Sequence, residues 1–266
     1  MHTSFEVAGT CRPLVFSAYV LLLCGSSGSK AEETPDWRRA QESLGAAVVV
    51  IEQPYRDVRP TVVPVPWINW RWDRLHIDGM SAGYDLAQKP SYTMSLVIQP
   101  RFDQVSAGES PDLSAIRSRS MSLDGGVSVG TRYAGISFSL SAVHDTLGKS
   151  HGSVLAAGLS KGLPYAGSWW VLSTGIDWED RRSTNYYFGV SPSEAGPSRP
   201  AYSPASAVNA HVGVFCLHPL GGKWTAVLGT QYTKLGHSIA DSPLVGSDYG
   251  AIFVLGATYD FAGNRP

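Results

Sequence analysis

The segment 249–261 places an apolar side chain at every second position, and this alternation constrains the fold more than any other feature. One face carries Tyr249, Ala251, Phe253, Leu255, Ala257, Tyr259 and Phe261, and the other mixes glycines and carboxylates with Ile252, Val254 and Thr258. Successive side chains of a β-strand point to opposite faces. Its length suits a tilted strand across a bilayer, which needs about 9–11 residues. The pattern predicts the closing strand of an outer-membrane β-barrel.

The same alternation recurs along the chain. Other apolar faces are formed by Tyr92, Met94, Leu96 and Ile98, by Phe138 and Leu140, by Trp170, Leu172, Ile176 and Trp178, by Val208 and Val212, and by Trp224, Leu228 and Tyr232. A secreted β-sandwich would also have one apolar face per strand. The opposite faces here, however, are rich in Ser, Gly and Thr, only 16% of residues are charged, and Trp and Tyr flank the apolar stretches. These features favour an all-β, transmembrane antiparallel barrel.

The pattern predicts ten to twelve strands, and the count should be even because both ends of such a barrel lie in the periplasm. The expected strands are 44–53, 62–72, 74–87, 91–104, 121–133, 134–146, 152–161, 167–179, 206–218, 222–234 and 247–261, with 184–190 as a possible twelfth. Two long connections, 104–120 and 180–205, remain. Loops of this length in a compact domain are usually functional or disordered. The pattern leaves their sidedness open.

The N-terminus has the features of an export signal. Arg12 precedes an apolar run at 14–23, and Ser29 and Ala31 form a small-x-small cleavage site. We therefore expect a signal peptide at 1–31, a periplasmic lead-in at 32–43, the barrel at 44–261 and a tail at 262–266. Cys24 would need a small residue before it to be a lipoprotein cysteine, and Leu23 is not small. Cleavage would leave Cys216 as the one cysteine of the mature chain.

Sequence patterns for catalysis or for metal and nucleic-acid binding are weak. His144 and Asp145 end one expected strand and His151 and Ser153 open the next, so a Ser-His-Asp cluster at one rim is a minor alternative. G-x-S-x-G patterns occur at 79–83, 126–130, 148–152 and 158–162, but they lie within or between expected strands, so none forms the strand-to-helix turn of a nucleophile elbow. His211 and His218 are seven residues apart in one strand and should face opposite sides. A net charge of -1 argues against nucleic acid. We expect no catalytic residue, cofactor or metal.

Several motifs resemble one known family. They are NYYFGV at 185–190, SEA at 193–195, RPAY at 199–202, DSPLV at 241–245 and GATYDF at 256–261. In this order and spacing they resemble the MipA/OmpV (MltA-interacting protein) family of outer-membrane proteins. The family has no agreed catalytic residue, so the motif positions are candidates for structure or partner contact. They are Tyr186, Tyr187, Phe188, Gly189, Arg199, Pro200, Tyr202, Asp241, Ser242 and Pro243.

The resemblance implies a non-enzymatic barrel in the cell outer membrane. One member of the family is known as a scaffold that joins a lytic murein transglycosylase to a bifunctional penicillin-binding protein, and others are immunogenic proteins linked to adhesion or osmotic response. A scaffold for murein hydrolases and synthases is therefore expected. Two alternatives stay open: a surface adhesin, or a narrow solute channel. In the channel, Arg71, Arg101 and Arg132 would pair with Asp78, Asp85 or Asp260 and fill part of the lumen.

The other expected contacts are outer-membrane lipid and the assembly machinery. Outer-membrane strands commonly end at an aromatic residue that this machinery reads, so Tyr259 and Phe261 are the predicted assembly signal. The chain departs from that pattern because Ala-Gly-Asn-Arg-Pro follows Phe261.

Overall fold

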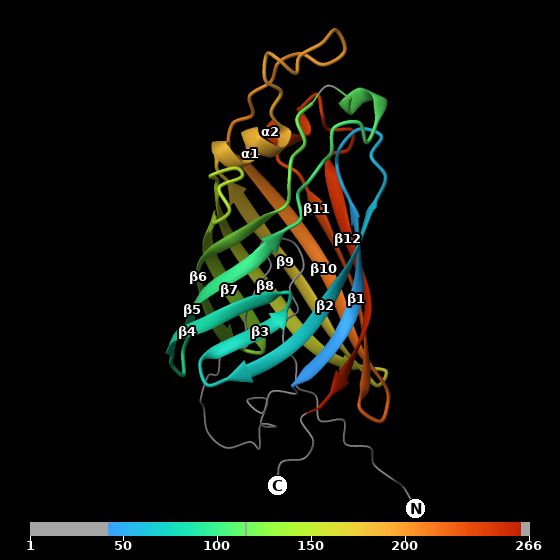
Figure 1. Ribbon diagram of the computed structural model, residues 1–266. Coiled ribbons are helices and arrows are strands. Elements are labelled where there is room, and N and C mark those ends of the chain that lie inside the picture. Colours follow the sequence, from blue (N-terminus) through green and yellow to red (C-terminus); the bar gives the residue numbers. More distant parts are fainter. Residues whose placement is uncertain (1–41, 115, 262–266) are drawn as a thin grey trace, which may run out of the picture.

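Twelve antiparallel strands close into one barrel in the computed structural model (Figure 1), which describes residues 42–114 and 116–261. They are β1 (Ser43–Glu52), β2 (Thr61–Trp72), β3 (Leu75–Gly79), β4 (Ser81–Gln88), β5 (Thr93–Arg101), β6 (Ser122–Tyr133), β7 (Ile136–Asp145), β8 (Ser153–Tyr165), β9 (Ser168–Glu179), β10 (Ala207–Gly221), β11 (Trp224–Lys234) and β12 (Tyr249–Asp260). Each strand pairs with its neighbours in sequence, and β1 pairs with β12 to close the ring. The predicted signal peptide, most of the lead-in and the tail lie outside the described residues.

The predicted all-β barrel of ten to twelve strands is confirmed, with two corrections. The single strand expected at 74–87 is wrong, because the chain reverses at Gly79 and Met80 and forms the separate strands β3 and β4. Gly79 has a φ of 64°, a conformation that costs glycine little and other residues more. The possible strand at 184–190 is also wrong: residues 181–188 form the helix α1 (Arg181–Phe188). The two corrections leave the strand count at twelve.

The apolar faces of the strands point outward. Phe253, Leu255, Leu96 and Leu140 are 46%, 63%, 47% and 63% exposed, whereas a soluble sandwich would bury them. Their neighbours on the other face, such as Val254 and Thr258, are buried inside the barrel. A barrel with an apolar exterior of this kind is solvated by lipid. Among the described residues no helix has the length and apolar character to cross a bilayer.

The two ends of the barrel differ in the length of their connections. Short turns at 73–74, 89–92, 134–135, 166–167 and 222–223 lie at the end where β1 begins and β12 stops. The turns 134–135 and 166–167 are Ala-Gly pairs with positive φ at both residues, as tight hairpin turns require. The longer loops 53–60, 102–121, 146–152, 180–206 and 235–248 lie at the opposite end (Figure 1). Outer-membrane barrels have short periplasmic and long external connections, so both predicted long loops lie outside the cell.

The lumen is largely occupied by side chains. An apolar cluster on β1, β2 and β9–β12 includes Trp67 and Phe215, whose stacked rings have centroids 6.1 Å apart across the barrel. The wall formed by β4–β8 is more polar and has only a small apolar cluster of Val97, Val143, Val154 and Ala156. Arg71 of β2 pairs with Asp85 of β4 at 2.7 Å, one of the pairings expected from the sequence. Arg101 instead pairs with Asp124 and Glu179, so its predicted partners were wrong. The barrel is therefore mostly filled, as twelve strands around a small lumen allow.

The wall is incomplete between β2 and β5. Because β3 and β4 are short, residues 61–67 of β2 pair only with β1, and residues 99–101 of β5 pair only with β6. We call these two facing edges the open seam. Its edges carry Pro64, Pro66 and Pro100, which have no N–H to donate and are tolerated where a strand lacks one neighbour. The remaining strand prolines, Pro164 and Pro219, are likewise paired on one side only.

Closure of the barrel between β1 and β12 leads to a prediction at Gly45. A side chain there would collide with the backbone of Ala257 and Thr258 on β12. We expect Gly45→Val to lower the free energy of unfolding by about 1–3 kcal/mol, the usual cost of overpacking. Urea unfolding of the purified barrel, followed by its mobility on unheated gels, measures the change. Ala46→Val, one residue along and exposed on the outer face, is the matched control. Equal stability of the two variants would contradict the prediction.

Candidate functional site: the cap over the outer mouth

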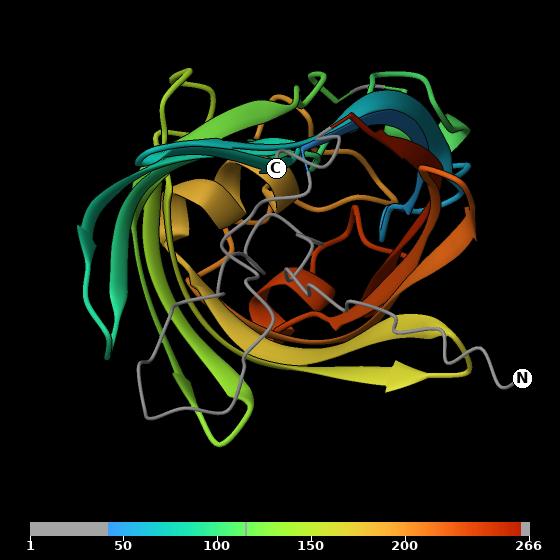
Figure 2. The same cartoon turned by 90° about the horizontal axis from the view of Figure 1, so that it is seen from below.

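Four external loops pack together over the outer mouth. We call residues 53–60, 102–121, 180–206 and 235–248 the cap, leaving out residue 115. It contains the short helices η1 (Pro111–Leu113) and α2 (His237–Ala240) besides α1. Its buried apolar core draws on every one of these loops and consists of Tyr55, Val105, Leu113, Ile116, Tyr187, Phe188, Val190, Ile239, Leu244 and Val245, with Ala207 of β10. Seen from the periplasmic end, α1 and α2 lie within the outline of the strands (Figure 2).

Local sequence explains why α1 forms where a strand was expected. Asp180 begins the helix by accepting a hydrogen bond from the Ser183 backbone N–H at 2.9 Å, a common N-cap interaction. Ser183, Thr184, Tyr187 and Phe188 are all buried and follow helical rather than alternate spacing. The aromatic residues are thus buried on one helical face against the other loops. Packing against the rest of the cap outweighs their β-propensity.

The motif residues of 186–189 contact the other cap loops. The ring of Tyr55 stacks on that of Phe188 with centroids 5.5 Å apart, and its hydroxyl donates to the Tyr187 carbonyl at 3.2 Å. Ser242 donates to the Phe188 carbonyl at 2.6 Å. The Gly189 carbonyl accepts from Arg119 at 3.2 Å. The structure therefore brings the motifs at 185–190 and 241–245 into direct contact.

The remaining motif positions join the same assembly. Tyr202 forms a β-bridge with Val190 and donates its hydroxyl hydrogen bond to the Ser238 carbonyl at 3.0 Å. Arg199 donates to the Glu194 carbonyl from Nε and Nη2, at 3.0 and 2.8 Å. The Tyr186 hydroxyl accepts a hydrogen bond from the Ser120 backbone N–H, and the Pro243 carbonyl accepts one from Arg56. Asp241 ends α2, and Pro200 precedes the bridge between Val190 and Tyr202.

The predicted assembly signal lies at the other end of the barrel. Tyr259 meets Trp224 edge to face at 5.2 Å on the outer surface near the periplasm. The Phe261 backbone N–H donates to the Glu42 carbonyl at 3.0 Å, and the Phe261 ring is exposed. These two residues therefore have no contact with the cap, and their role in assembly stays a prediction.

The buried carboxylate of Glu194 connects the cap loops 102–121 and 180–206. It accepts from the backbone N–H groups of Arg117 at 2.8 Å and Ser191 at 2.9 Å, from the Ser191 hydroxyl at 2.8 Å and from Arg119 at 3.0 Å. Burial opposes ionisation, but these hydrogen bonds and the Arg119 charge more than offset it, so the pKa of Glu194 is lowered to about 2. The carboxylate stays ionised across all ordinary pH values.

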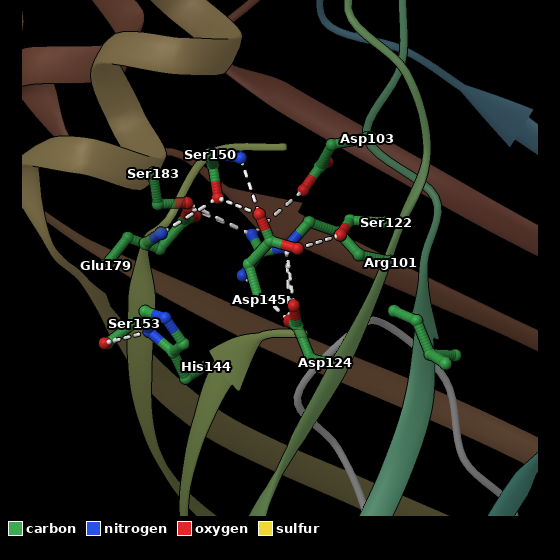
Figure 3. A network of polar contacts seen from close by, with 12 residues as sticks. Arg101, Asp103, Ser122, Asp124, His144, Asp145, Ser150, Ser153, Glu179 and Ser183 are labelled. Carbon is green, nitrogen blue, oxygen red and sulfur yellow. Dashed lines mark hydrogen bonds and ion pairs between the residues drawn. The ribbon is translucent and has the colours of Figure 1, made fainter. Parts of the chain in front are cut away.

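A buried ionic layer joins the cap to the barrel wall (Figure 3). Arg101 of β5 is completely buried and contacts Asp124 of β6 at 2.9 Å and Glu179 of β9 at 3.4 Å. It also donates to the Ser183 hydroxyl of α1 at 3.2 Å, and its guanidinium lies 5.5 Å from the Tyr187 ring centroid. Ser183 in turn donates to Glu179 at 2.8 Å. One cation therefore holds two strands and the helix of the cap together.

Sequence reasoning missed Arg119, Glu179 and Ser183 as parts of this site. Glu179 and Ser183 are separated by four residues across a strand end and a helix start, a geometry that the expected strand at 184–190 concealed. Glu194 lay inside the SEA motif but carried no recognisable role. Arg101 was expected to form an ion pair inside the barrel, and it does so, but its partners Asp124 and Glu179 were not identified from the sequence.

The possible Ser-His-Asp cluster is not assembled. His144 Nδ1 lies 3.0 Å from Ser153 Oγ on the outer face. Asp145 points into the barrel, where it accepts from the Ser122 and Ser150 hydroxyls (Figure 3). His211 faces inward beside Asp177 and His218 is exposed, on opposite sides as predicted. Within the described residues no group of three or more His, Cys, Asp or Glu is arranged to hold a metal ion.

The ionic layer makes Arg101 a sensitive position. Arg101→Gln would leave the buried carboxylates of Asp124 and Glu179 without their cation, a change that typically costs about 3–5 kcal/mol. We expect a lower urea midpoint and faster proteolysis within 180–206. Arg132→Gln, which alters a half-buried inward arginine near the periplasmic end, is the control. Unchanged proteolysis of the Arg101 variant would contradict the stated role.

Glu194 gives the cap a defined pH dependence. Because its pKa falls from an ordinary 4.5 to about 2, its stabilisation is fully present above pH 4.5 and is lost as the pH falls towards 2. Hydrogen exchange of 180–206 should therefore show wild type better protected than Glu194→Gln above pH 4.5, with the difference vanishing near pH 2. Glu109→Gln, at an exposed cap position, should match wild type throughout. A difference that persists at pH 2 would rule out this explanation.

Comparison with known proteins identifies several relatives. The chain is 27% identical over 224 residues to the MltA-interacting protein of Escherichia coli K12, covering 82% of this chain and 90% of that protein. It is 23% identical over 222 residues to the putative outer membrane protein YiaT of Escherichia coli O157:H7, with the same coverage. It is 29% identical over 123 residues to the outer membrane protein OmpV of Vibrio cholerae, covering 43% of this chain and 44% of that protein.

Solved structures resemble the chain only loosely. A Pseudomonas aeruginosa FadL homologue is 11% identical with a TM-score of 0.34, covering 82% of this chain and 89% of that one. The barrel assignment therefore comes from the strand pairing itself. The family model described as MltA-interacting protein MipA matches residues 44–261, which span all twelve strands but the first residue of β1. The chain belongs to the MipA family of outer-membrane β-barrel proteins.

Proposed function

We propose that this barrel is a non-catalytic scaffold that holds murein-processing enzymes at the inner surface of the outer membrane. The name of the Escherichia coli relative, MltA-interacting protein, supports a murein hydrolase as one partner. The same proposal includes export by a cleaved signal at 1–31, a periplasmic lead-in at 32–43, the barrel at 44–261 and a short tail at 262–266. It also includes recognition of Tyr259 and Phe261 by the assembly machinery.

The observation that carries the proposal is the filling of the barrel. The cap packs a buried apolar core over the outer mouth, and Arg101 ties that cap to the wall. Below it, Trp67 and Phe215 stack across the lumen. Both features disfavour free passage of solute along the axis. A barrel of this kind acts more readily through its surfaces than through its interior.

The periplasmic turns offer a charged surface for such contacts. Arg74, Lys89, Lys161 and Lys223 are exposed at or next to these turns, and Asp73 is the exposed carboxylate among them. Among the described residues, the exposed cations at this rim therefore outnumber the exposed anions. An acidic patch on a periplasmic enzyme would be attracted to it, and such rim charges mainly raise the association rate.

A crosslinking experiment in native membranes tests the scaffold. A photoreactive residue is placed at position 90 or 222 in the periplasmic turns, or at position 59 in the cap as the control. We expect murein hydrolases or synthases among the products at positions 90 and 222 only, identified by mass spectrometry. The triple variant Arg74→Glu, Lys89→Glu, Lys223→Glu should reduce these products at least tenfold, whereas Arg59→Glu should leave them unchanged.

Three results would overturn the proposal. One is the absence of murein enzymes from the turn crosslinks, and another is their equal recovery from the cap position. The third is steady ion conductance of the purified protein in planar bilayers, which would favour the channel. Loss of host-cell binding on deleting 190–202 would instead support the adhesin, the remaining alternative from the sequence.

A further inference from the structure

The lipid-facing wall has an apolar groove of about 450 Å³ spanning β6–β10. Ala142 of β7 and Ala157 of β8 are outward residues whose side chains end at Cβ, so they form its floor. Leu140, Leu155, Trp178 and Val208 rise around them. Leu140 pairs with Ala157 and Leu155 pairs with Ala142, so each small residue faces a large one. The groove therefore arises from the sequence of two paired strands.

The size and lining of the groove suit a flexible hydrocarbon. Its volume lies within the range of small-molecule sites, about 300–1,000 Å³. Its walls are almost wholly apolar side chains on a surface that the fold exposes to the bilayer. An acyl chain lying along the barrel wall would fill it.

The external end of the groove is polar. The next outward pair above Ala142 and Leu155 is His144 with Ser153, whose Nδ1 and Oγ atoms lie 3.0 Å apart on the exposed surface (Figure 3). Both side chains can exchange hydrogen bonds with a head group. The outer surface thus changes from apolar to hydrogen-bonding side chains between one outward residue pair and the next. This change occurs at the end of the barrel that bears the cap.

Basic side chains are exposed in the two segments that adjoin this polar pair. Lys149 and His151 are exposed in the loop 146–152, and Arg181 and Arg182 are exposed at the start of α1. The Asp180 backbone N–H donates to the Ser153 carbonyl at 3.0 Å, which fixes the start of α1 beside the groove.

The carboxylates near this polar pair do not cancel that charge at the surface. Asp145 is buried and accepts hydrogen bonds from its own loop, Glu179 is buried beside Arg101, and half-buried Asp180 caps the helix. Arg181 donates to the Ser203 hydroxyl, which leaves its charge uncompensated. An anion at this rim would meet several cations and few exposed carboxylates.

We propose that the groove and its cationic rim bind one phosphate-bearing, acylated lipid of the outer leaflet. One acyl chain lies over Ala142 and Ala157, the phosphate meets Lys149 and Arg182, and His144 and Ser153 hydrogen-bond the head group. Arginine and lysine both bind phosphate well. An amphiphile satisfies both parts at once.

Native mass spectrometry of the barrel in mild detergent tests the proposal, with diphosphoryl lipid A as the probe and phosphatidylethanolamine as the comparison lipid. We expect one lipid A to be retained in preference to phosphatidylethanolamine. Ala142→Leu with Ala157→Leu fills the groove and should lower lipid A binding at least tenfold. Lys149→Glu with Arg182→Glu should remove the preference for lipid A.

The matched control is Ala226→Leu, which enlarges an outward alanine on β11, away from the groove. It should bind lipid A as wild type does, and mobility on unheated gels shows that every variant is folded. Unchanged binding by the groove variants, or an equal loss in the control, would overturn the proposal. So would a dimer that excludes lipid and disappears on filling the groove, since it would identify a second copy as the occupant.

Discussion

The backbone pairing of β1 with β12 is the constraint on which the rest of the structure depends. In hydrocarbon no water is present to satisfy N–H and C=O groups, so a sheet spans the membrane as a closed ring. Here the strand pairing is continuous around the periplasmic half of the barrel, and the open seam interrupts it only towards the external end. The pairing runs from Ser43 with Asp260 to Glu52 with Ala251, the full length of β1. It joins the two ends of the described barrel, and it requires small residues such as Gly45 where the backbones approach. Closure fixes the inside and the outside, and with them the position of every alternating residue.

The cap is held by two kinds of interaction that reinforce each other. Its apolar core is assembled from four loops that are far apart in the sequence, so loss of one loop exposes the others. The ionic layer beneath gives this packing a fixed orientation, because a buried guanidinium needs its carboxylates in defined positions. Arg101 obtains Asp124 and Glu179 from the wall and Ser183 from α1. The family motifs at 185–190, 193–195, 199–202 and 241–245 lie in these loops, and the barrel wall supports them.

Much of the fold could be predicted because its determinants are local. Alternation in 249–261 or around Leu96 and Leu140 needs no knowledge of tertiary contacts, since lipid replaces the second protein layer. The incorrect predictions concern segments whose structure depends on tertiary contacts. The aromatic run 184–190 resembles a strand in sequence, yet Asp180 caps a helix there, and burial of Tyr187 and Phe188 in the cap stabilises that helix. The partners of Arg101 depend on the tilt of strands around the barrel, which single-strand patterns do not contain. The motifs indicated which loops matter, but the contact between Ser242 and Phe188 could only come from coordinates.

The prolines at the open seam have a lasting consequence for the wall. Two unpaired strand edges that both carry backbone N–H and C=O groups can form hydrogen bonds with each other when motion brings them close enough. At Pro64, Pro66 and Pro100 the donor is missing from the covalent structure. No rearrangement of the barrel can restore it, so a complete ladder of hydrogen bonds between these two edges is excluded. The same missing donors disfavour the addition of a strand from a neighbouring barrel to these edges, which lowers the tendency to aggregate edge to edge in a crowded membrane.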